Sequence, residues 1–218
     1  MSIGEYSVDH FQTLPSLEVA RTNFVNLNGD DLVKDVFRKF FVEQGMDRTF
    51  GLAMLHRHFD LKPGEMLVDY QGTSVPWDAG HVSGMKPPQP AIWAVSSDGE
   101  FKPTEFYFSE EKGLTIGEEE LRFMKRFQEL LREHKVTQSF GLCRYPGDDF
   151  NGLCEITHGR ANINLKPNDW PKNLSAVDTA WFFWEPIWTR GCRCTCNARS
   201  PDHPHGVHIY TVSGYRRQ

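Results

Sequence analysis

A pattern that occurs twice, ninety positions apart, constrains the fold of this chain more than any other sequence feature. Residues 33–52 and 123–142 carry apolar residues at matching places, and both segments end in the triplet Phe-Gly-Leu. The matched pairs are Val33/Phe123, Phe37/Phe127, Phe40/Leu130, Phe41/Leu131 and Glu43/Glu133. In each copy the spacing predicts an amphipathic helix that leads into a strand. We therefore expect an α+β fold that arose by internal duplication.

The residues around each copy predict two β-α-β-β-β modules. In the first, a helix runs from Asp30 or Asp31 to about Gln44, and Gly45 ends it. In the second, a capping box at residues 115–118 opens a helix that runs to about Lys135. The strands are expected at residues 22–27, 49–59, 65–70, 90–96 and 103–109, then at 138–144, 152–158, 162–165 and 179–184.

We expect one domain of 218 residues made of two similar halves, about 21–109 and 110–190. The halves would pack about a pseudo-twofold as a mixed or antiparallel sheet with two long helices. Residues 1–20 would form an arm over the domain, and a Cys/His-rich tail would span residues 191–218. A loop at residues 72–90 is long enough to act as a lid over a cleft between the halves.

Composition narrows the classes of function. A net charge of −5 and a pI near 6.0 provide no basic footprint for nucleic acid. The N-terminal residues lack the basic and apolar regions of a signal peptide, and no apolar run is long enough to span a bilayer. Five cysteines, an odd number, fit a reducing compartment. These features predict a cytoplasmic protein without a membrane partner.

Two histidines in the first half are candidate metal ligands. On a strand, His56 and His58 would point to the same face, and Glu65 across a turn could add a carboxylate. Two imidazoles and one carboxylate suit Fe²⁺ or catalytic Zn²⁺. The alternative is a strand rim with two solvent-facing histidines. The spacing Gly51-x4-His56-x-His58-x6-Glu65 also resembles the first cupin motif, which implies a metal-binding barrel, but the companion motif is absent.

The second half could add His158, which would face His56 and His58 across the cleft. Three imidazoles could bind a metal or act as general acid–base groups. Arg160 could then hold a substrate carboxylate. The alternative is that His158 is a surface residue at the end of a strand.

The C-terminal tail holds six potential metal donors within 17 residues, which are Cys192, Cys194, Cys196, His203, His205 and His208. Thiolates and imidazoles favour Zn²⁺, and the Cys-x-Cys spacing also suits Cu⁺. The cysteines could instead be structural or redox-active thiols. Cys143 and Cys154 lie on apolar strands and are expected to be buried.

An aromatic run near residue 181 could wall a ligand pocket. Alternation would place Trp181 and Phe183 on one face of a strand, with Glu185 at the pocket mouth. Trp77 and His81, from the long loop, could complete this pocket. The alternative is a central strand that is covered on both faces.

Two functions follow from these residues. The first is a small-molecule enzyme that acts on a partly apolar substrate. Its histidine-based site would bind a divalent metal, with Zn²⁺ expected before Fe or Cu. The second is a non-catalytic binding or interaction module with a structural zinc clasp. No phosphate-binding or dinucleotide motif occurs, so no nucleotide cofactor is expected. Exposed strand edges could also support a homodimer.

The chain resembles a family of uncharacterised proteins of filamentous fungi. The resemblance is carried by Gly51-Leu52 with residues 56–61, by residues 159–162 and by the late Cys/His cluster. It implies an intracellular fungal protein and assigns no activity.

Overall fold

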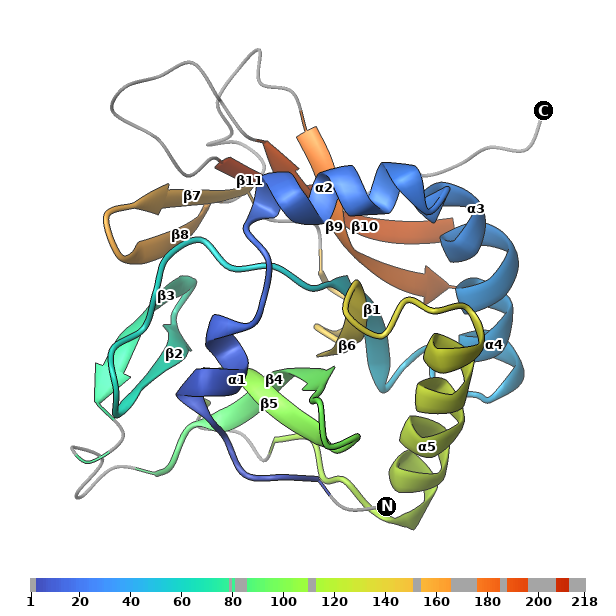
Figure 1. The fold of residues 1–218 in the computed structure, drawn as a ribbon, viewed down its shortest axis with the longest axis horizontal. Coiled ribbons are helices and arrows are strands. Elements are labelled where there is room, and N and C mark those ends of the chain that lie inside the picture. Colours follow the sequence, from blue (N-terminus) through green and yellow to red (C-terminus); the bar gives the residue numbers. More distant parts are fainter. Residues whose placement is uncertain are drawn as a thin grey trace.

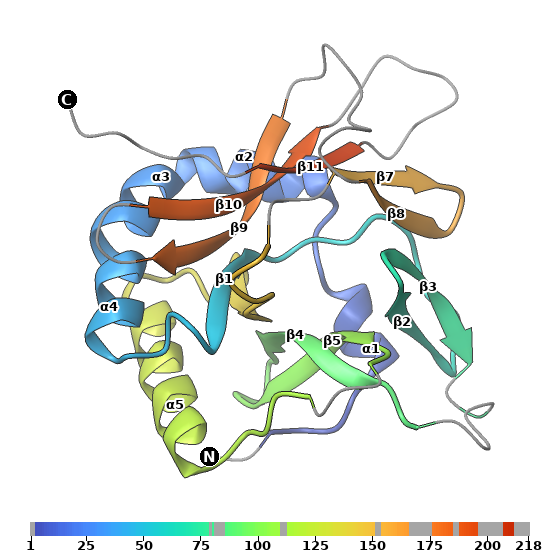
Figure 2. The same cartoon turned by 180° about the vertical axis from the view of Figure 1, so that it is seen from behind.

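A computed structural model gives the fold of residues 3–78, 80, 86–109, 113–150, 154–165, 176–184, 188–195 and 207–211. The fold is mixed α+β, and its strands form one curled sheet that closes in the order β1-β6-β4-β5-β2-β3-β8-β7-β11-β10-β9 (Figures 1 and 2). Most neighbours are antiparallel, but β2 and β5 are parallel. Within the described ranges, no helix is both long and apolar enough to cross a membrane.

The strands come from both halves of the chain. The first half supplies β1 Phe50–Met54, β2 Glu65–Tyr70, β3 Thr73–Asp78, β4 Gln89–Val95 and β5 Phe101–Tyr107. The second supplies β6 Phe140–Arg144, β7 Cys154–His158, β8 Ala161–Leu165, β9 Ala176–Trp184, β10 Trp188–Thr195 and β11 Val207–Thr211. Each half forms one run of neighbouring strands, except that β6 of the second half lies between β1 and β4 of the first, so both halves contribute to the ring.

The described helices cover one side of the barrel, except the first, whose Phe11 packs on Leu55, Leu67 and Ala94 elsewhere in the core. They are α1 Val8–Gln12, α2 Leu17–Asn26, α3 Gly29–Asp31, the π-helix η1 Leu32–Phe37, α4 Arg38–Glu43 and α5 Glu118–Glu133. Figure 1 shows α3, α4 and α5 on one side, away from the β2–β3 and β7–β8 hairpins. Their apolar faces bury Phe37, Phe41 and Phe127 against β1, β6 and β9 in the largest core cluster. This packing is the burial predicted from the helical spacing.

The two repeated segments pair with each other. β1 and β6 run antiparallel, with Leu52 opposite Leu142. The Leu55 amide donates to the Ser139 carbonyl at 2.9 Å, and the Tyr145 amide donates to the Thr49 carbonyl at 3.1 Å. The second bond repeats the first with the copies exchanged. Each helix also ends in a left-handed residue at the equivalent place, Gly45 (φ 66°) and Lys135 (φ 58°).

Close packing explains why each triplet has a central glycine. A Cβ on Gly51 would collide with the Phe182 ring and would lie 2.9 Å from Cys143 Sγ. A Cβ on Gly141 would collide with the Trp93 carbonyl oxygen and would lie 2.7 Å from a methyl of Leu55. On the inner face of the β1–β6 pair, Gly51 and Gly141 therefore lie where a larger residue would collide with its neighbours.

Several sequence predictions need correction. The strand predicted at residues 22–27 is the end of α2, and residues 1–20 contribute α1 and the start of α2 in addition to extended chain. The loop predicted at 72–90 contains β3, and β1 ends at Met54, before His56. The first of the two long helices is divided by the π-helical turns of η1. These predictions rested on weak local preferences in short segments, and tertiary packing overrides such preferences.

We predict that Gly51→Ala and Gly141→Ala each lower the free energy of unfolding by about 1–3 kcal/mol, because the added methyl overfills a close contact. Chemical denaturation followed by circular dichroism measures this. Gly80→Ala is the control, since Gly80 is exposed and its Cβ would meet only the Asp78 carboxylate, at 3.2 Å. Equal stability of all three variants would contradict the packing argument.

Candidate functional site

A small polar cavity lies inside the barrel. Its volume is about 40 Å³, enough for a few water molecules or an ion. Four titratable side chains line it, His56, His58, Glu105 and Glu155, together with Thr104 and Thr179. Leu14, Leu55, Ile92 and other apolar residues complete the wall. The cavity thus joins titratable groups from both halves of the chain in an otherwise apolar interior.

The contact between His58 and Glu155 brings the two halves together in this cavity. His58 Nε2 lies 3.2 Å from Glu155 Oε1, and the two side chains are only 5% and 9% exposed. Along β7, Glu155 and Thr157 are buried whereas His158 is exposed. Strand alternation therefore turns Glu155 inward. Glu155 was not among the predicted site residues, although its place three residues before His158 in the same predicted strand was a usable signal.

His56 is held as a neutral imidazole beside His58. The two rings meet edge to face, with centroids 5.0 Å apart. Burial lowers the pKa of His56 to about 4, a shift that its hydrogen bond to Met54 only partly offsets. His56 Nδ1 lies 2.8 Å from the Met54 carbonyl oxygen, an acceptor, so Nδ1 carries the proton and Nε2 carries the lone pair.

Glu105 is the carboxyl group best suited to exchange protons near neutrality. Burial raises its pKa from 4.5 to about 7, and the nearby Asp69 charge adds to the rise. The β4–β5 register shifts on both sides of Ile92. Such a bulge re-aims side chains, which explains why the adjacent residues Thr104 and Glu105 both line the cavity.

A larger, open cavity of about 790 Å³ lies where several strands meet at one end of the barrel. Its wall includes Asp69, Tyr107, Phe108 and Arg144, at or just beyond the ends of β2, β5 and β6. The Arg144 guanidinium lies over the Tyr107 ring, 4.2 Å from its centroid. We call this space the mouth cavity. It combines cationic, anionic and aromatic surfaces, and Asp69 links it electrostatically to Glu105.

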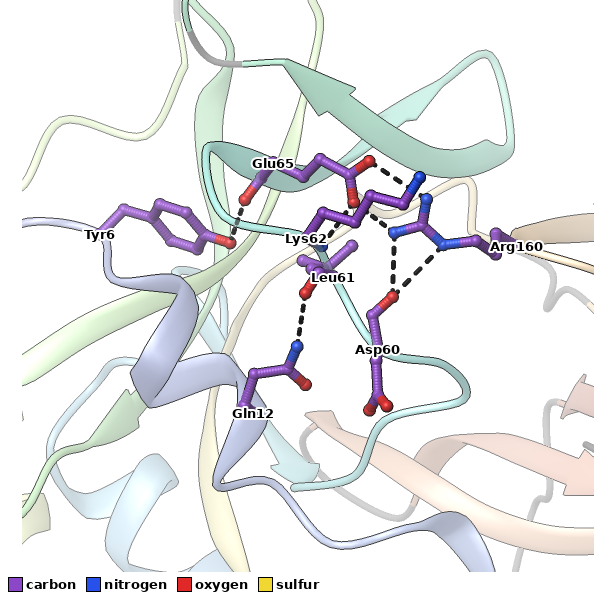
Figure 3. Close-up of polar contacts among 7 residues, drawn as sticks. All are labelled: Tyr6, Gln12, Asp60, Leu61, Lys62, Glu65 and Arg160. Atoms are coloured by element: carbon purple, nitrogen blue, oxygen red, sulfur yellow. Dashed lines mark hydrogen bonds and ion pairs between the residues drawn. The ribbon is translucent and has the colours of Figure 1, made fainter.

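Glu65 and Arg160 bind each other and do not enter the interior cavity (Figure 3). Arg160 Nη1 donates to Glu65 Oε1 at 3.1 Å, a second nitrogen bonds the other carboxylate oxygen, and Nη2 also donates to the Asp60 carbonyl at 2.9 Å. The Arg160 hydrogen bond lowers the pKa of Glu65. The pair ties the start of β2 to the β7–β8 turn. The predicted ligand role of Glu65 and substrate role of Arg160 therefore correspond to a structural contact here.

The predicted three-histidine arrangement is not formed. His56 and His58 lie together, but His158 is exposed at the end of β7 and is not part of the cavity wall. It follows Thr157, whose inward direction obliges His158 to turn outward. Among the side chains that the structure describes, no three His, Cys, Asp or Glu residues are grouped to hold a metal ion.

The predicted aromatic pocket is part of the protein core. Trp181 stacks on Phe24 at 5.4 Å and Phe183 contacts Phe41 at 5.0 Å, both beneath the helices. Their exposed fractions of 5% and 1% leave no surface for a ligand. Trp77 packs edge to face on Phe108 of the mouth cavity, with ring centroids 5.3 Å apart. His81 and Glu185 lie outside the described residues.

The Cys/His tail is described only in part, and only by its backbone. Cys192 and Cys194 belong to β10, and His208 belongs to β11. Cys196, His203 and His205 lie outside the described residues. Of the other cysteines, Cys143 is buried as predicted, and burial raises the pKa of its thiol to about 12. Cys154 lies on β7.

Comparisons with known proteins do not assign this chain to a family. No protein-family model matches the chain, and no curated protein or solved structure was found to match it.

We predict that the free energy of unfolding falls as pH rises, and that the ionisation of Glu105 causes part of this fall. Because folding raises its pKa, the folded state binds the extra proton between about pH 4.5 and 7, and this contribution is lost as pH rises through 7. The wild type should lose up to about 3 kcal/mol relative to Glu105→Gln between pH 5 and 8. Urea denaturation at several pH values, with EDTA present, measures the difference.

The control for that measurement is Glu119→Gln, at an exposed position of α5. This variant should follow the wild type at every pH. A Glu105→Gln variant that also followed the wild type would show that Glu105 ionises as an ordinary solvated carboxyl.

Proposed function

We propose that this protein is an enzyme that moves a proton on a small, partly apolar molecule at the interior cavity. The observation that carries the proposal is that Glu105 lines one cavity together with His56, His58 and Glu155. Burial there raises the pKa of Glu105 to about 7, so that it can both accept and donate a proton at neutral pH. It faces the cavity that also holds the His58–Glu155 pair. Several titratable groups in one pocket, with pKa values shifted by burial, are typical of acid–base sites.

The two cavities suggest how a substrate would bind. The interior cavity is too small for a whole organic molecule, whereas the mouth cavity has the volume of a small-molecule site. We infer that the body of the substrate lies in the mouth cavity and that its reacting carbon approaches Glu105. In the chemical step, ionised Glu105 would take a proton from a carbon beside a carbonyl and later return it. The Glu105 carboxyl group would therefore act first as the base and then as the acid.

Arg144 would recognise an anionic end of the substrate. No carboxylate forms an ion pair with it among the described residues, and its guanidinium is already oriented by the Tyr107 ring. A guanidinium binds a carboxylate through two parallel hydrogen bonds, and the aromatic residues Tyr107 and Phe108 would contact the apolar part. We therefore propose a small oxo acid with an aromatic or aliphatic side chain as the substrate class.

The catalytic proposal is tested by proton–deuterium exchange. Pyruvate, phenylpyruvate and acetoacetate are incubated with the protein in D₂O, and loss of the carbon-bound proton is followed by NMR. We expect exchange that rises with pH through about 7, because the ionised carboxylate is the base, and that falls about 100-fold in Glu105→Gln. Glu119→Gln is the control. Full activity in Glu105→Gln would refute the role of Glu105.

The binding proposal is tested by calorimetry with phenylpyruvate. Arg144→Gln should weaken binding about 10- to 100-fold, because a charge-assisted pair is lost. Arg122→Gln provides the matched control, since Arg122 lies on the exposed side of α5 beside Glu118. Equal affinity in the two variants would place the ligand elsewhere.

A non-catalytic binding module is the second candidate function. The mouth cavity favours it, because its size and mixed lining suit a ligand whether or not chemistry follows. Binding of phenylpyruvate without exchange of any probe would support this alternative. The structural zinc clasp of the tail stays a prediction, as do the homodimer, the cytoplasmic location and the fungal family.

We also propose that the chain arose by internal duplication, with a local pseudo-twofold between its copies. The support is the exchange of equivalent hydrogen bonds across β1 and β6 and the matching helix ends at Gly45 and Lys135. The remaining strands of the two halves differ in number and pairing, so the proposal concerns residues 33–55 and 123–145.

A further inference from the structure

The mouth cavity holds an anionic group as well as the cationic Arg144. Asp69, near the end of β2, lines this cavity. Among the described residues, no Lys, Arg or His side chain forms an ion pair with it. The Asp69 charge acts on Glu105, whose pKa it raises in addition to the effect of burial. Asp69 is therefore a carboxylate in a cavity wall that lacks a counter-charge from the described part of the protein.

Hydrogen bonds from neutral donors orient the Asp69 carboxylate. The Gly72 amide donates to Oδ1 at 3.2 Å, and the Ser74 hydroxyl and Asn164 Nδ2 donate to Oδ2 at 3.5 and 3.4 Å. These distances are at the long end of the hydrogen-bond range. A carboxylate can accept at about four positions. Asp69 can therefore accept a further, shorter bond from a donor in the cavity.

The amide of Asn164 also lacks a donor. Because its Nδ2 is directed at Asp69, its Oδ1 is the group left to accept a hydrogen bond. Asn164 Oδ1 is buried, and no described residue donates to it. A buried acceptor without a donor is destabilising. Asp69 and Asn164 thus make one side of the mouth cavity rich in acceptors and favourable for a cation that donates hydrogen bonds.

The cationic group lies on the adjoining part of the cavity wall. In the parallel register of β2 with β5, Asp69 stands opposite Tyr107. Neighbouring strands are about 4.8 Å apart, and the Arg144 guanidinium lies over the Tyr107 ring. Arg144 and Asp69 do not form an ion pair with each other in the described structure. A ligand with a carboxylate and an ammonium group a few bonds apart would complement both charges.

We propose that Asp69 binds an ammonium group of the substrate while Arg144 binds its carboxylate, so that the substrate is an oxo acid with an amino group beside its carbonyl. The inference rests on the proposed function, because it uses the same cavity and the same role of Arg144, and it narrows the substrate class. Since the Asp69 charge acts on Glu105, an ammonium at Asp69 lies on the Glu105 side of the cavity.

This placement identifies the carbon that reacts. The carbon that bears the ammonium group is also the carbon beside the carbonyl, so its proton is the one that Glu105 takes. The C–H bond breaks, the proton forms an O–H bond on the Glu105 carboxylate, and the electron pair moves into the carbonyl to give an enolate. Return of the proton to that carbon restores the Glu105 carboxylate and the carbonyl.

Two probes that differ only in the ammonium group test the proposal. They are 5-aminolevulinate and levulinate, and calorimetry measures the affinity of each. We expect the wild type to bind 5-aminolevulinate about 10- to 100-fold more tightly, because a charge-assisted hydrogen bond is added. Asp69→Asn keeps the shape of the side chain and should remove this preference without weakening levulinate. Asp30→Asn, at an exposed position of α3, is the control and should keep the preference.

Two results would overturn the role of Asp69. The first is equal affinity of the wild type for the two probes. The second is an equal loss of both probes in Asp69→Asn while Asp30→Asn binds normally, because it would show that Asp69 only supports the structure. Circular dichroism of each variant checks that the fold is retained.

The same experiment separates this inference from the proposed function. Arg144→Gln should weaken both probes. If it does so while the wild type binds both probes equally, only the Asp69 subsite is refuted. If the preference depends on Asp69 while Glu105→Gln keeps full proton–deuterium exchange, only the acid–base role is refuted. Failure of the wild type to bind either probe would refute the mouth cavity as the substrate site, and the role of Asp69 with it.

Discussion

The antiparallel contact between β1 and β6 is the interaction on which the rest of the structure depends. It joins two segments ninety positions apart, and its outer face carries Phe50, Leu52, Phe140 and Leu142 into the core beneath the helices. Its inner face has no side chain at Gly51 or Gly141, so that neighbouring residues can pack closely against the backbone there. One strand pair thus anchors the helical layer on one side and shapes the barrel interior on the other.

The barrel creates the conditions for chemistry by mixing the two halves around one ring. β7 and β9 bring Glu155 and Thr179 to the cavity that His58 also lines, and the bulge at Ile92 turns Glu105 toward it. Burying a carboxyl group without a counter-charge disfavours its ionised form. This explains why the pKa of Glu105 rises while that of Glu65, which Arg160 binds near the surface, falls. Two glutamates of one chain therefore have opposite properties, for reasons of position alone.

The sequence predicted local features well and long-range ones poorly. The helix that ends at Gly45, the capped helix α5 and the alternation of Trp181 and Phe183 follow from spacing of neighbouring residues, and the structure has them. The proximity of His56 and His58 was also predicted. Glu155 was missed, because its inward direction depends on which face of β7 meets the barrel. The bulge that re-aims Glu105 leaves no mark in the residue pattern, and the pairing of Glu65 with Arg160 joins positions that no local rule connects.

The central claim is that closure of the barrel sets His58 from the first half against Glu155 of β7 from the second. A crystal structure of the protein, refined at a resolution that places side-chain atoms, tests it most directly. We expect His58 Nε2 and Glu155 Oε1 about 3.2 Å apart, in a cavity that Glu105 also lines. His58 and Glu155 in separate surroundings, or Glu105 directed away from both, would contradict it.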